Sequence, residues 1–192
     1  MRHTGRYSHA HRRIAAAATR RERGHQRDML FQLTTKRVLV RGVEREFTLL
    51  PHPGAVVIVP EQGGRIALVR QLRPAVDEHL WELPAGTLQP QEDPAVAAAR
   101  ELAEETGLRA ASWKLLGQFY PAPGYSTERM HLFLARDLTA GDPNYDEGED
   151  IETVDWFAPS ELATMVSDGR IRDAKTIAAL YYWHLETRTT PW

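Results

Sequence analysis

The sequence predicts a single domain of mixed strands and helices, in the α+β or α/β class. Three observations predict this fold. β-Rich and apolar runs recur along the chain, one internal segment has a marked helical pattern, and two more helices are expected near the C-terminus. With 192 residues, 42% of them hydrophobic and 26% charged, the chain has the size and composition of a globular domain with a substantial core.

The strands are expected mainly from apolar and β-branched runs. Two β-rich segments between Thr34 and Leu50 flank Gly42 and predict a hairpin. The run from Ala55 to Pro60 is continuously apolar, as in a strand buried on both faces, and a Gly63-Gly64 turn follows it. Further strands are expected at residues 66–69, 80–83, 113–120, 131–135 and 153–157.

The internal helix is expected to begin at Asp93, an N-cap residue that proline follows at the first helical position. Gly107 supplies its C-terminal stop. Its small, apolar inner face is expected to consist of Val96, Ala99, Leu102, Ala103 and Thr106. Two helices, at residues 159–167 and 173–185, are expected to complete the fold.

The net charge of −2 hides an asymmetry along the chain. Residues 1–28 contain eight arginines against Glu22 and Asp28, for +6, so the remainder carries −8. We expect a solvated N-terminal extension that is disordered or partly helical. Contact with nucleic acid and docking onto the acidic body are the alternatives. The segment lacks the apolar run of about 7–15 residues that a secretory signal needs.

Missing residue types exclude several classes of protein. There is no cysteine, which excludes disulfides, thiolate metal sites and a cysteine nucleophile. No apolar run approaches the roughly 18 residues of a membrane span. The motifs of serine hydrolases, P-loop proteins and zinc enzymes are also missing. A cytoplasmic enzyme is therefore expected.

Residues 86 to 108 form a cassette of glycine and carboxylates. It reads Gly86, five residues, Glu92, seven residues, and then Arg100-Glu101-Leu102-Ala103-Glu104-Glu105-Thr106-Gly107-Leu108. Glu101, Glu104 and Glu105 stand at i, i+3 and i+4 of the predicted helix, so their side chains share one face. Clustered anions cost Coulomb energy unless a cation sits among them, and carboxylate oxygens suit Mg²⁺ or Mn²⁺. The pattern indicates metal-assisted chemistry on a phosphate compound.

A solvated acidic face is the alternative interpretation of this helix. Here, however, the residue identities fit one template, a coincidence on the order of 10⁻⁹ per starting position. The cassette resembles the Nudix box. The resemblance spans roughly residues 34 to 185 and is to the branch that hydrolyses ADP-ribose and nucleotide sugars. It includes the segments 69–74 and 80–86 before the box and 122–126 after it.

The resemblance implies an α/β/α sandwich of the α+β class, in which a mixed sheet lies between helices and an N-terminal hairpin is added. It implies three regions. Residues 1–28 form the extension, residues 29–54 a hairpin that is the swapped dimerisation element of a homodimer, and residues 55–192 the Nudix domain.

The resemblance also implies roles for the residues of the box. The implied metal ligands are Glu101 and Glu105 first, then Glu104 and the backbone carbonyl of Ala85. Gly86 removes a Cβ where the backbone must approach an ion and its phosphate. Arg100 is implied to orient one glutamate through a salt bridge. Glu92 lies just before the helix, where the helix dipole favours a carboxylate, and we expect it to be mainly structural or to support the ligands from behind.

The general base of this branch comes from a mobile loop after the box, here residues 143–152. Glu149 is the first choice for the base or an extra metal ligand, Glu147 the second and Glu152 a distant third. A solvated acidic loop is the alternative. The implied substrate-binding residues are Arg73, for the diphosphate, Glu82, and Ser126 and Glu128, for the terminal ribose. Phe47, Trp81 and Tyr125 are equal candidates for stacking on adenine, and packing in the core is the alternative for each of them.

These expectations combine into Mg²⁺-dependent hydrolysis of nucleoside diphosphate sugars, with ADP-ribose giving AMP and ribose 5-phosphate. Mn²⁺ is a possible substitute. Another nucleotide sugar, such as ADP-glucose or GDP-mannose, is the first alternative. A catalytically silent ADP-ribose-binding regulator is the second. Membrane partners are not expected, and the acidic body argues against nucleic acid.

Overall fold

The computed structural model describes residues 32–141 and 150–188, and predictions on other residues lie outside it. The described elements all belong to one compact unit, Leu33–Trp192. In chain order they are β1 (Thr34–Val40), β2 (Val43–Leu49), β3 (Ala55–Gln62), β4 (Arg65–Arg73), β5 (Glu78–Glu82), β6 (Ala85–Thr87), α2 (Pro94–Thr106), β7 (Leu108–Phe119), β8 (Met130–Ala140), β9 (Ile151–Phe157), α3 (Pro159–Ser167) and α4 (Ala174–Thr187).

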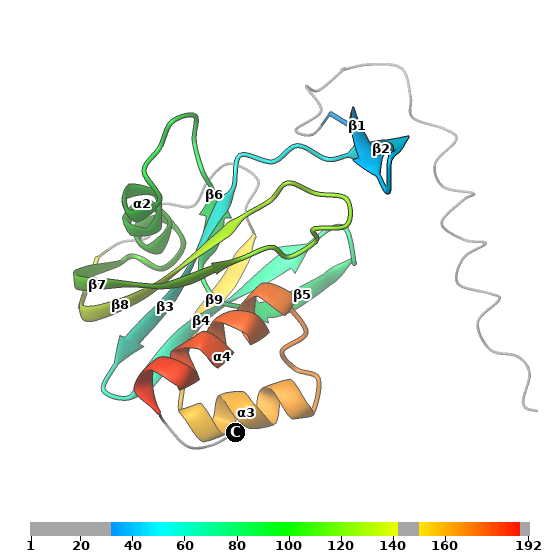
Figure 1. Cartoon of the computed structure of the whole chain (residues 1–192). Coiled ribbons are helices and arrows are strands. Elements are labelled where there is room, and N and C mark those ends of the chain that lie inside the picture. The colour runs from blue at the N-terminus through cyan, green and yellow to red at the C-terminus, as the bar shows by residue number, and fades with distance from the viewer. Residues whose placement is uncertain (1–31, 142–149, 189–192) are drawn as a thin grey trace, which may run out of the picture. The chain divides into compact units, whose positions relative to one another are not determined.

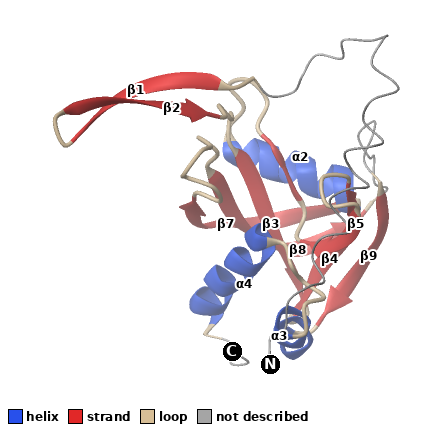
Figure 2. Ribbon diagram, turned by 90° about the vertical axis from the view of Figure 1, so that its right-hand side faces the viewer, coloured by secondary structure: helices blue, strands red, loops and turns tan. Residues whose placement is uncertain are grey.

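A mixed seven-stranded sheet forms the centre of this unit (Figure 2). The strands follow the order β5-β4-β3-β8-β7, while β6 pairs with β3 and β9 pairs with β4. β3 and β8 are parallel, and the other pairs are antiparallel. β3 and β4 pair only beside their turn, at Glu61↔Ile66 and Gln62↔Arg65. The sheet therefore has two halves, one around β3 and β8 and the other around β4.

Helices cover both faces of the sheet, with α2 on one side and α3 and α4 on the other (Figure 1). β3 is buried on both faces, as its unbroken apolar run predicts. Val57 and Val59 point into a core shared with α3 and α4, whereas Val56 and Ile58 point into a second core under α2. The α/β/α sandwich expected from the sequence is confirmed.

The predicted capping of α2 is confirmed, but of its predicted inner face only Leu102 is fully buried. Asp93 accepts a hydrogen bond from the backbone N–H of Ala95 at 2.8 Å, and Gly107 ends the helix with a φ of 68°. Val96 is 60% exposed. The buried residues of α2 are Ala97, Ala98, Glu101, Leu102 and Glu105. The helix is rotated from the expected orientation because two of its carboxylates, and not only its apolar residues, face the sheet.

The predicted strands are present with different ends. β7 begins at Leu108, directly after the helix stop, and not at residue 113. The short strand β6 was not predicted, because three residues are too few to show a periodic pattern. β6 pairs Ala85 and Gly86 with Val57 and Val56 of β3, and this pairing fixes the entry to the carboxylate helix.

The predicted hairpin is confirmed as β1 and β2, which pair from Thr34↔Leu49 to Val40↔Val43. Arg41 and Gly42 make its turn with φ values of 51° and 80°, as a two-residue turn of type I′ requires. Every residue of β1 is exposed. Within the described residues, no helix has the length and apolar character needed to span a membrane.

Candidate active site

Arg100 is the centre of the charged cluster on α2. Its Nη1 donates to Oε1 of Glu101 at 2.7 Å and to Oε2 of Glu104 at 2.9 Å. Its Nε and Nη2 donate to the two oxygens of Glu92, each at 2.9 Å. The hydrogen bonds to the three carboxylates, that to Glu92 first, raise the pKa of Arg100. The hydrogen bond from Arg100 in turn lowers the pKa of Glu92. Arg100 therefore stays charged and binds three carboxylates at once.

Two carboxylates of α2 reach the backbone of β6. The Glu105 side chain accepts a hydrogen bond from the N–H of Ala85 at 3.1 Å. A Cβ placed on Gly86 would lie 1.9 Å from the Glu101 carboxylate, so only glycine leaves room for it there. Glu101 and Glu105 are 6% and 1% exposed. The structure thus brings Glu101, Glu105 and Ala85 together, with Glu104 beside them through Arg100.

This donor set fits a hard divalent cation. Buried carboxylate and backbone carbonyl oxygens are the ligands that Mg²⁺ and Mn²⁺ prefer, and the missing Gly86 side chain lets the Glu101 carboxylate reach the backbone of β6. In the described part of the chain, however, no three acidic or histidine side chains converge as a ready-made metal cluster. The cation found between Glu101 and Glu104 is the guanidinium of Arg100.

A second charged cluster lies at the ends of β4 and β5. Arg73 donates through Nε and Nη2 to the two oxygens of Glu82, at 2.9 and 2.6 Å. Lys175, in the first turn of α4, donates to the same carboxylate and to Asp173. Glu82 is 1% exposed. Because both of its oxygens are bonded to cations, Glu82 is placed to hold Arg73 and Lys175.

The two clusters act on each other electrostatically. The hydrogen bond to Glu82 is the main cause that raises the pKa of Arg73, and the charges of Glu105 and Asp173 raise it further against the effect of burial. The start of α4 is tied to the same region, since the hydroxyl of Thr176 accepts from the N–H of Leu83 at 2.8 Å. Residues from β4, β5, β6, α2 and α4 therefore form one charged site.

Two other predicted residues lie in a separate loop. The backbone N–H of Glu128 donates to the Ser126 hydroxyl at 3.1 Å, and the Glu128 carboxylate lies 3.8 Å from Nε2 of His52. This loop is joined to the end of β2, where Leu50 donates to the carbonyl of Tyr125 at 2.7 Å. These contacts connect Ser126 and Glu128 to the base of the hairpin.

The predicted general bases Glu147 and Glu149 lie outside the described residues. The residues that follow them are fixed on β4. The carbonyl of Asp150 accepts from the N–H of Leu72 at 3.0 Å, and Glu152 pairs with Arg70 at 2.5 Å. Asp150, at the described end of the predicted catalytic loop, is thus bonded to Leu72, the residue of β4 that precedes Arg73.

The aromatic candidates differ in exposure. Trp81 packs edge-on against Phe157, with ring centroids 5.0 Å apart, and touches the core under α4. Phe47 and Tyr125 are 43% and 61% exposed. Trp81 is therefore a packing residue, and Phe47 and Tyr125 keep a free ring surface.

Sequence reasoning missed Lys175 and Asp173. They lie far from the carboxylate cassette along the chain, and only the packing of α4 beside β5 brings them to Glu82. An Asp at a helix N-cap with a Lys two residues later is a common local pattern. No signal in the sequence could have connected it to Glu82.

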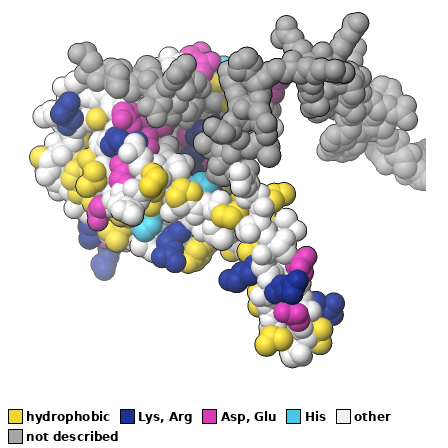
Figure 3. All heavy atoms as spheres, turned by 90° about the horizontal axis from the view of Figure 1, so that it is seen from above, with side chains coloured by type: hydrophobic (Ala, Val, Ile, Leu, Met, Phe, Trp, Pro, Cys, Tyr) yellow, Lys and Arg dark blue, Asp and Glu magenta, His cyan; other side chains and the backbone are white. Residues whose placement is uncertain are grey.

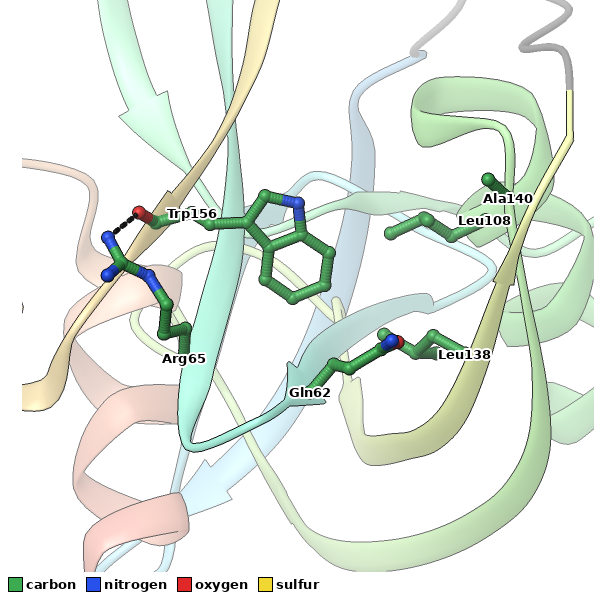
Figure 4. A pocket seen from close by; sticks show the side chains of 6 residues that line it. All are labelled: Gln62, Arg65, Leu108, Leu138, Ala140 and Trp156. Atoms are coloured by element: carbon green, nitrogen blue, oxygen red, sulfur yellow. Dashed lines mark hydrogen bonds between the residues drawn. The ribbon is translucent and has the colours of Figure 1, made fainter.

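One cavity of about 290 Å³ lies apart from these residues, between Gln62, Arg65, Leu108, Leu138, Ala140 and Trp156. Figure 4 shows the Trp156 indole facing Leu108 and Leu138, while the Arg65 guanidinium turns to the Trp156 carbonyl at 2.7 Å. None of the candidate site residues lines this cavity, so it has no part in the charged site.

Comparisons with known proteins match the region that contains these clusters. The NUDIX domain model matches residues 50–180. An ADP-ribose pyrophosphatase from Bacillus subtilis (strain 168) is 34% identical over 77% of this chain and 81% of its own length. An ADP-ribose pyrophosphatase from Mycobacterium tuberculosis (strain ATCC 25618 / H37Rv) is 38% identical over 82% of this chain and 78% of its own length.

A GDP-mannose pyrophosphatase from Cronobacter sakazakii (strain ATCC BAA-894) is 34% identical over 84% of this chain and 87% of its own length. Among solved structures, the crystal structure of an ADP compounds hydrolase superposes with a TM-score of 0.75 and 25% identity. The superposition covers 84% of this chain and 89% of the hydrolase chain.

Proposed function

Because the chain belongs to the Nudix family, we propose that it hydrolyses the diphosphate bond of nucleoside diphosphate sugars, with ADP-ribose as its main substrate. The protein is a Nudix pyrophosphohydrolase. The proposed products are AMP and ribose 5-phosphate.

The observation that carries the proposal is the contact between α2 and β6. The Glu101 carboxylate fills the space beside Gly86, and Glu105 accepts from the N–H of Ala85. Glu101 is paired with Arg100, and Glu105 is bonded to the Ala85 amide; carboxylate oxygens fixed in this way suit a hard divalent cation. Their position at a short strand, near Arg73, suits a site that binds a diphosphate together with a cation.

The proposed cation is Mg²⁺, with Mn²⁺ as a substitute, held by Glu101, Glu105 and the carbonyl of Ala85, with Glu104 as a further ligand. When bound, such an ion lowers the pKa of water and neutralises phosphate oxygens. Arg100 orients Glu101 and Glu104 through Nη1. The chain's own contribution at this point is the fixed orientation of the oxygen donors.

Arg73 is proposed to bind the diphosphate. Its Nε and Nη2 are bonded to Glu82, and within the described residues Nη1 has no hydrogen-bond acceptor, so this nitrogen remains to donate to a phosphate oxygen. Glu82, also proposed as a substrate-binding residue, positions the guanidinium. We propose Glu149, and after it Glu147, as the general base that accepts the proton of the attacking water, and Ser126 and Glu128 as contacts of the terminal ribose.

The test of the proposed function is the Glu105→Gln variant. The substitution keeps the size of a buried side chain and removes its charge, so kcat/KM for ADP-ribose with Mg²⁺ should fall at least about 100-fold. Glu186→Gln is the matched control, because Glu186 pairs with Lys114 at the surface and its loss should leave kcat/KM unchanged. Normal turnover by Glu105→Gln would refute the assignment.

GDP-mannose is the alternative substrate, since a GDP-mannose pyrophosphatase matches this chain as fully as an ADP-ribose pyrophosphatase does. The cation that the carboxylates would hold, and Arg73, would bind the diphosphate common to both compounds. A panel of kcat/KM values for ADP-ribose, ADP-glucose and GDP-mannose distinguishes them.

We also propose that the protein is a homodimer and that the β1–β2 hairpin is its dimerisation element. Val38, Val40, Val43 and Phe47 lie on one face of the hairpin by the strand register, and each is at least 39% exposed. An isolated two-stranded hairpin is marginally stable in water, so a second copy covering this face would stabilise it. The expected cytoplasmic location stays a prediction.

A further inference from the structure

Gln71 of β4 is a buried amide with an unused acceptor. The residue is 5% exposed. Its Oε1 is the one buried side-chain polar atom without a hydrogen-bond partner among the residues that the structure describes. Leaving such an atom unpaired costs free energy, because water no longer solvates it and no protein donor replaces water. Buried polar atoms without a partner are rare and often belong to functional sites.

The strand register places Gln71 in the charged site. Side chains alternate along a strand, so Val69, Gln71 and Arg73 share one face of β4. Antiparallel pairing puts Leu80 opposite Gln71, and Glu82 opposite Val69, on the same face. On this face of β4, Gln71 thus lies between Val69, which is opposite Glu82, and Arg73, whose guanidinium is bonded to Glu82.

The pairing of β4 with β9 is irregular at this point. Arg70 pairs with Thr153 and Gln71 with Ile151, so one residue of β9, Glu152, has no partner across the ladder. Bulges of this kind re-aim side chains and are frequent beside active sites. The irregularity is independent of the unpaired oxygen, and both features mark the same residue.

We propose that Gln71 positions the substrate by accepting a hydrogen bond from an O–H group that arrives with it. This inference rests on the proposed function. A diphosphate carries only acceptors near neutral pH, and Arg73 supplies a donor for it. An acceptor next to Arg73 fits instead a hydroxyl of the adjoining sugar, or a water that enters with the ligand. The two sources share one chemistry, an O–H donor.

The test compares wild-type protein with Gln71→Met, which keeps the length of the side chain and removes its amide. Without ligand and in EDTA, the melting temperature of Gln71→Met should be about 2 °C higher or more, since the unpaired oxygen is gone. The affinity for ADP-ribose, measured by calorimetry in EDTA so that no turnover occurs, should fall about tenfold. Gln118→Met is the control, because its amide already contacts His131, and its affinity should equal that of wild type.

A second ligand separates the two sources of the O–H group. ADP lacks the terminal ribose, so a contact with a hydroxyl of that ribose predicts that Gln71→Met weakens binding of ADP-ribose and leaves ADP binding unchanged. A water, or a hydroxyl of the ribose that ADP keeps, predicts an equal loss for both ligands. An affinity for ADP-ribose equal to that of wild type would overturn the inference, and so would a lower melting temperature. Wild-type protein that neither binds ADP-ribose in EDTA nor hydrolyses it with Mg²⁺ would count against the proposed function, and the same variants would then be compared with GDP-mannose.

Discussion

At the scale of single residues, Arg100 sets the geometry of the α2 carboxylates. Its two parallel hydrogen bonds to Glu92, both 2.9 Å long, give the planar guanidinium one orientation. In this orientation Nη1 faces Glu101 and Glu104. Glu92 therefore acts on the proposed metal ligands through Arg100, which gives physical content to the structural role expected from the sequence.

This arrangement predicts the behaviour of Glu92→Gln. The hydrogen bond from Arg100 lowers the pKa of Glu92 below its ordinary value of 4.5. A carboxylate with a lowered pKa stabilises the fold above pH 4.5 and loses that contribution as the pH falls through its folded-state pKa. At pH 7 the variant should be less stable by about 1 kcal/mol or less.

The measurement is urea unfolding of both proteins between pH 7 and pH 3. The free energies of unfolding should differ at pH 7 and converge below pH 4.5. A difference that stays constant over this range would mean that the charge of Glu92 has no part in the stability. The kcat of Glu92→Gln should fall far less than that of Glu105→Gln.

At the scale of elements, the close approach of β6 to α2 predicts opposite effects for two glycine substitutions. In Gly86→Ala, the new Cβ meets the flexible end of Glu101 at 1.9 Å. The carboxylate can swing away, so the melting temperature should change little while kcat/KM falls at least about tenfold. In Gly117→Ala, the Cβ lies 2.6 Å from the Tyr182 ring, which is packed against the core and cannot move freely.

Gly117→Ala should therefore lower the melting temperature by several degrees, about 1–3 kcal/mol, and keep the kcat of the folded protein. Thermal melting and steady-state kinetics on both variants check the pair. If Gly86→Ala retained full activity, the Glu101 carboxylate would not need its position beside β6.

The elements also show what the sequence could predict. Site residues that are close along the chain could be predicted, because helix spacing places Glu101, Glu104 and Glu105 on one face. The rotation of α2 was missed, since a rule that buries apolar residues puts Val96 inside and Glu105 outside. Lys175 was missed because its contact with Glu82 depends on how α4 packs. The unpaired oxygen of Gln71 is a property of the folded core, and no local pattern reveals it.

At the scale of the whole molecule, the hairpin is the part of the fold without a core of its own. Its strands pair with each other and not with the seven-stranded sheet, and Figure 3 shows apolar side chains beside charged ones on the hairpin. Leu50 connects it to the loop of Ser126. A dimer formed through the hairpin would therefore act on the loop proposed to contact the terminal ribose.

The homodimer is tested by two neighbouring substitutions on opposite faces of β2. Phe47 lies on the face of Val38, Val40 and Val43, and Thr48 lies on the other face. Phe47→Glu would bury a charge in the interface, so it should weaken dimerisation at least about tenfold by analytical ultracentrifugation. Thr48→Glu should sediment like wild type. A wild-type monomer at micromolar concentration, or equal effects of both variants, would exclude this face as the interface.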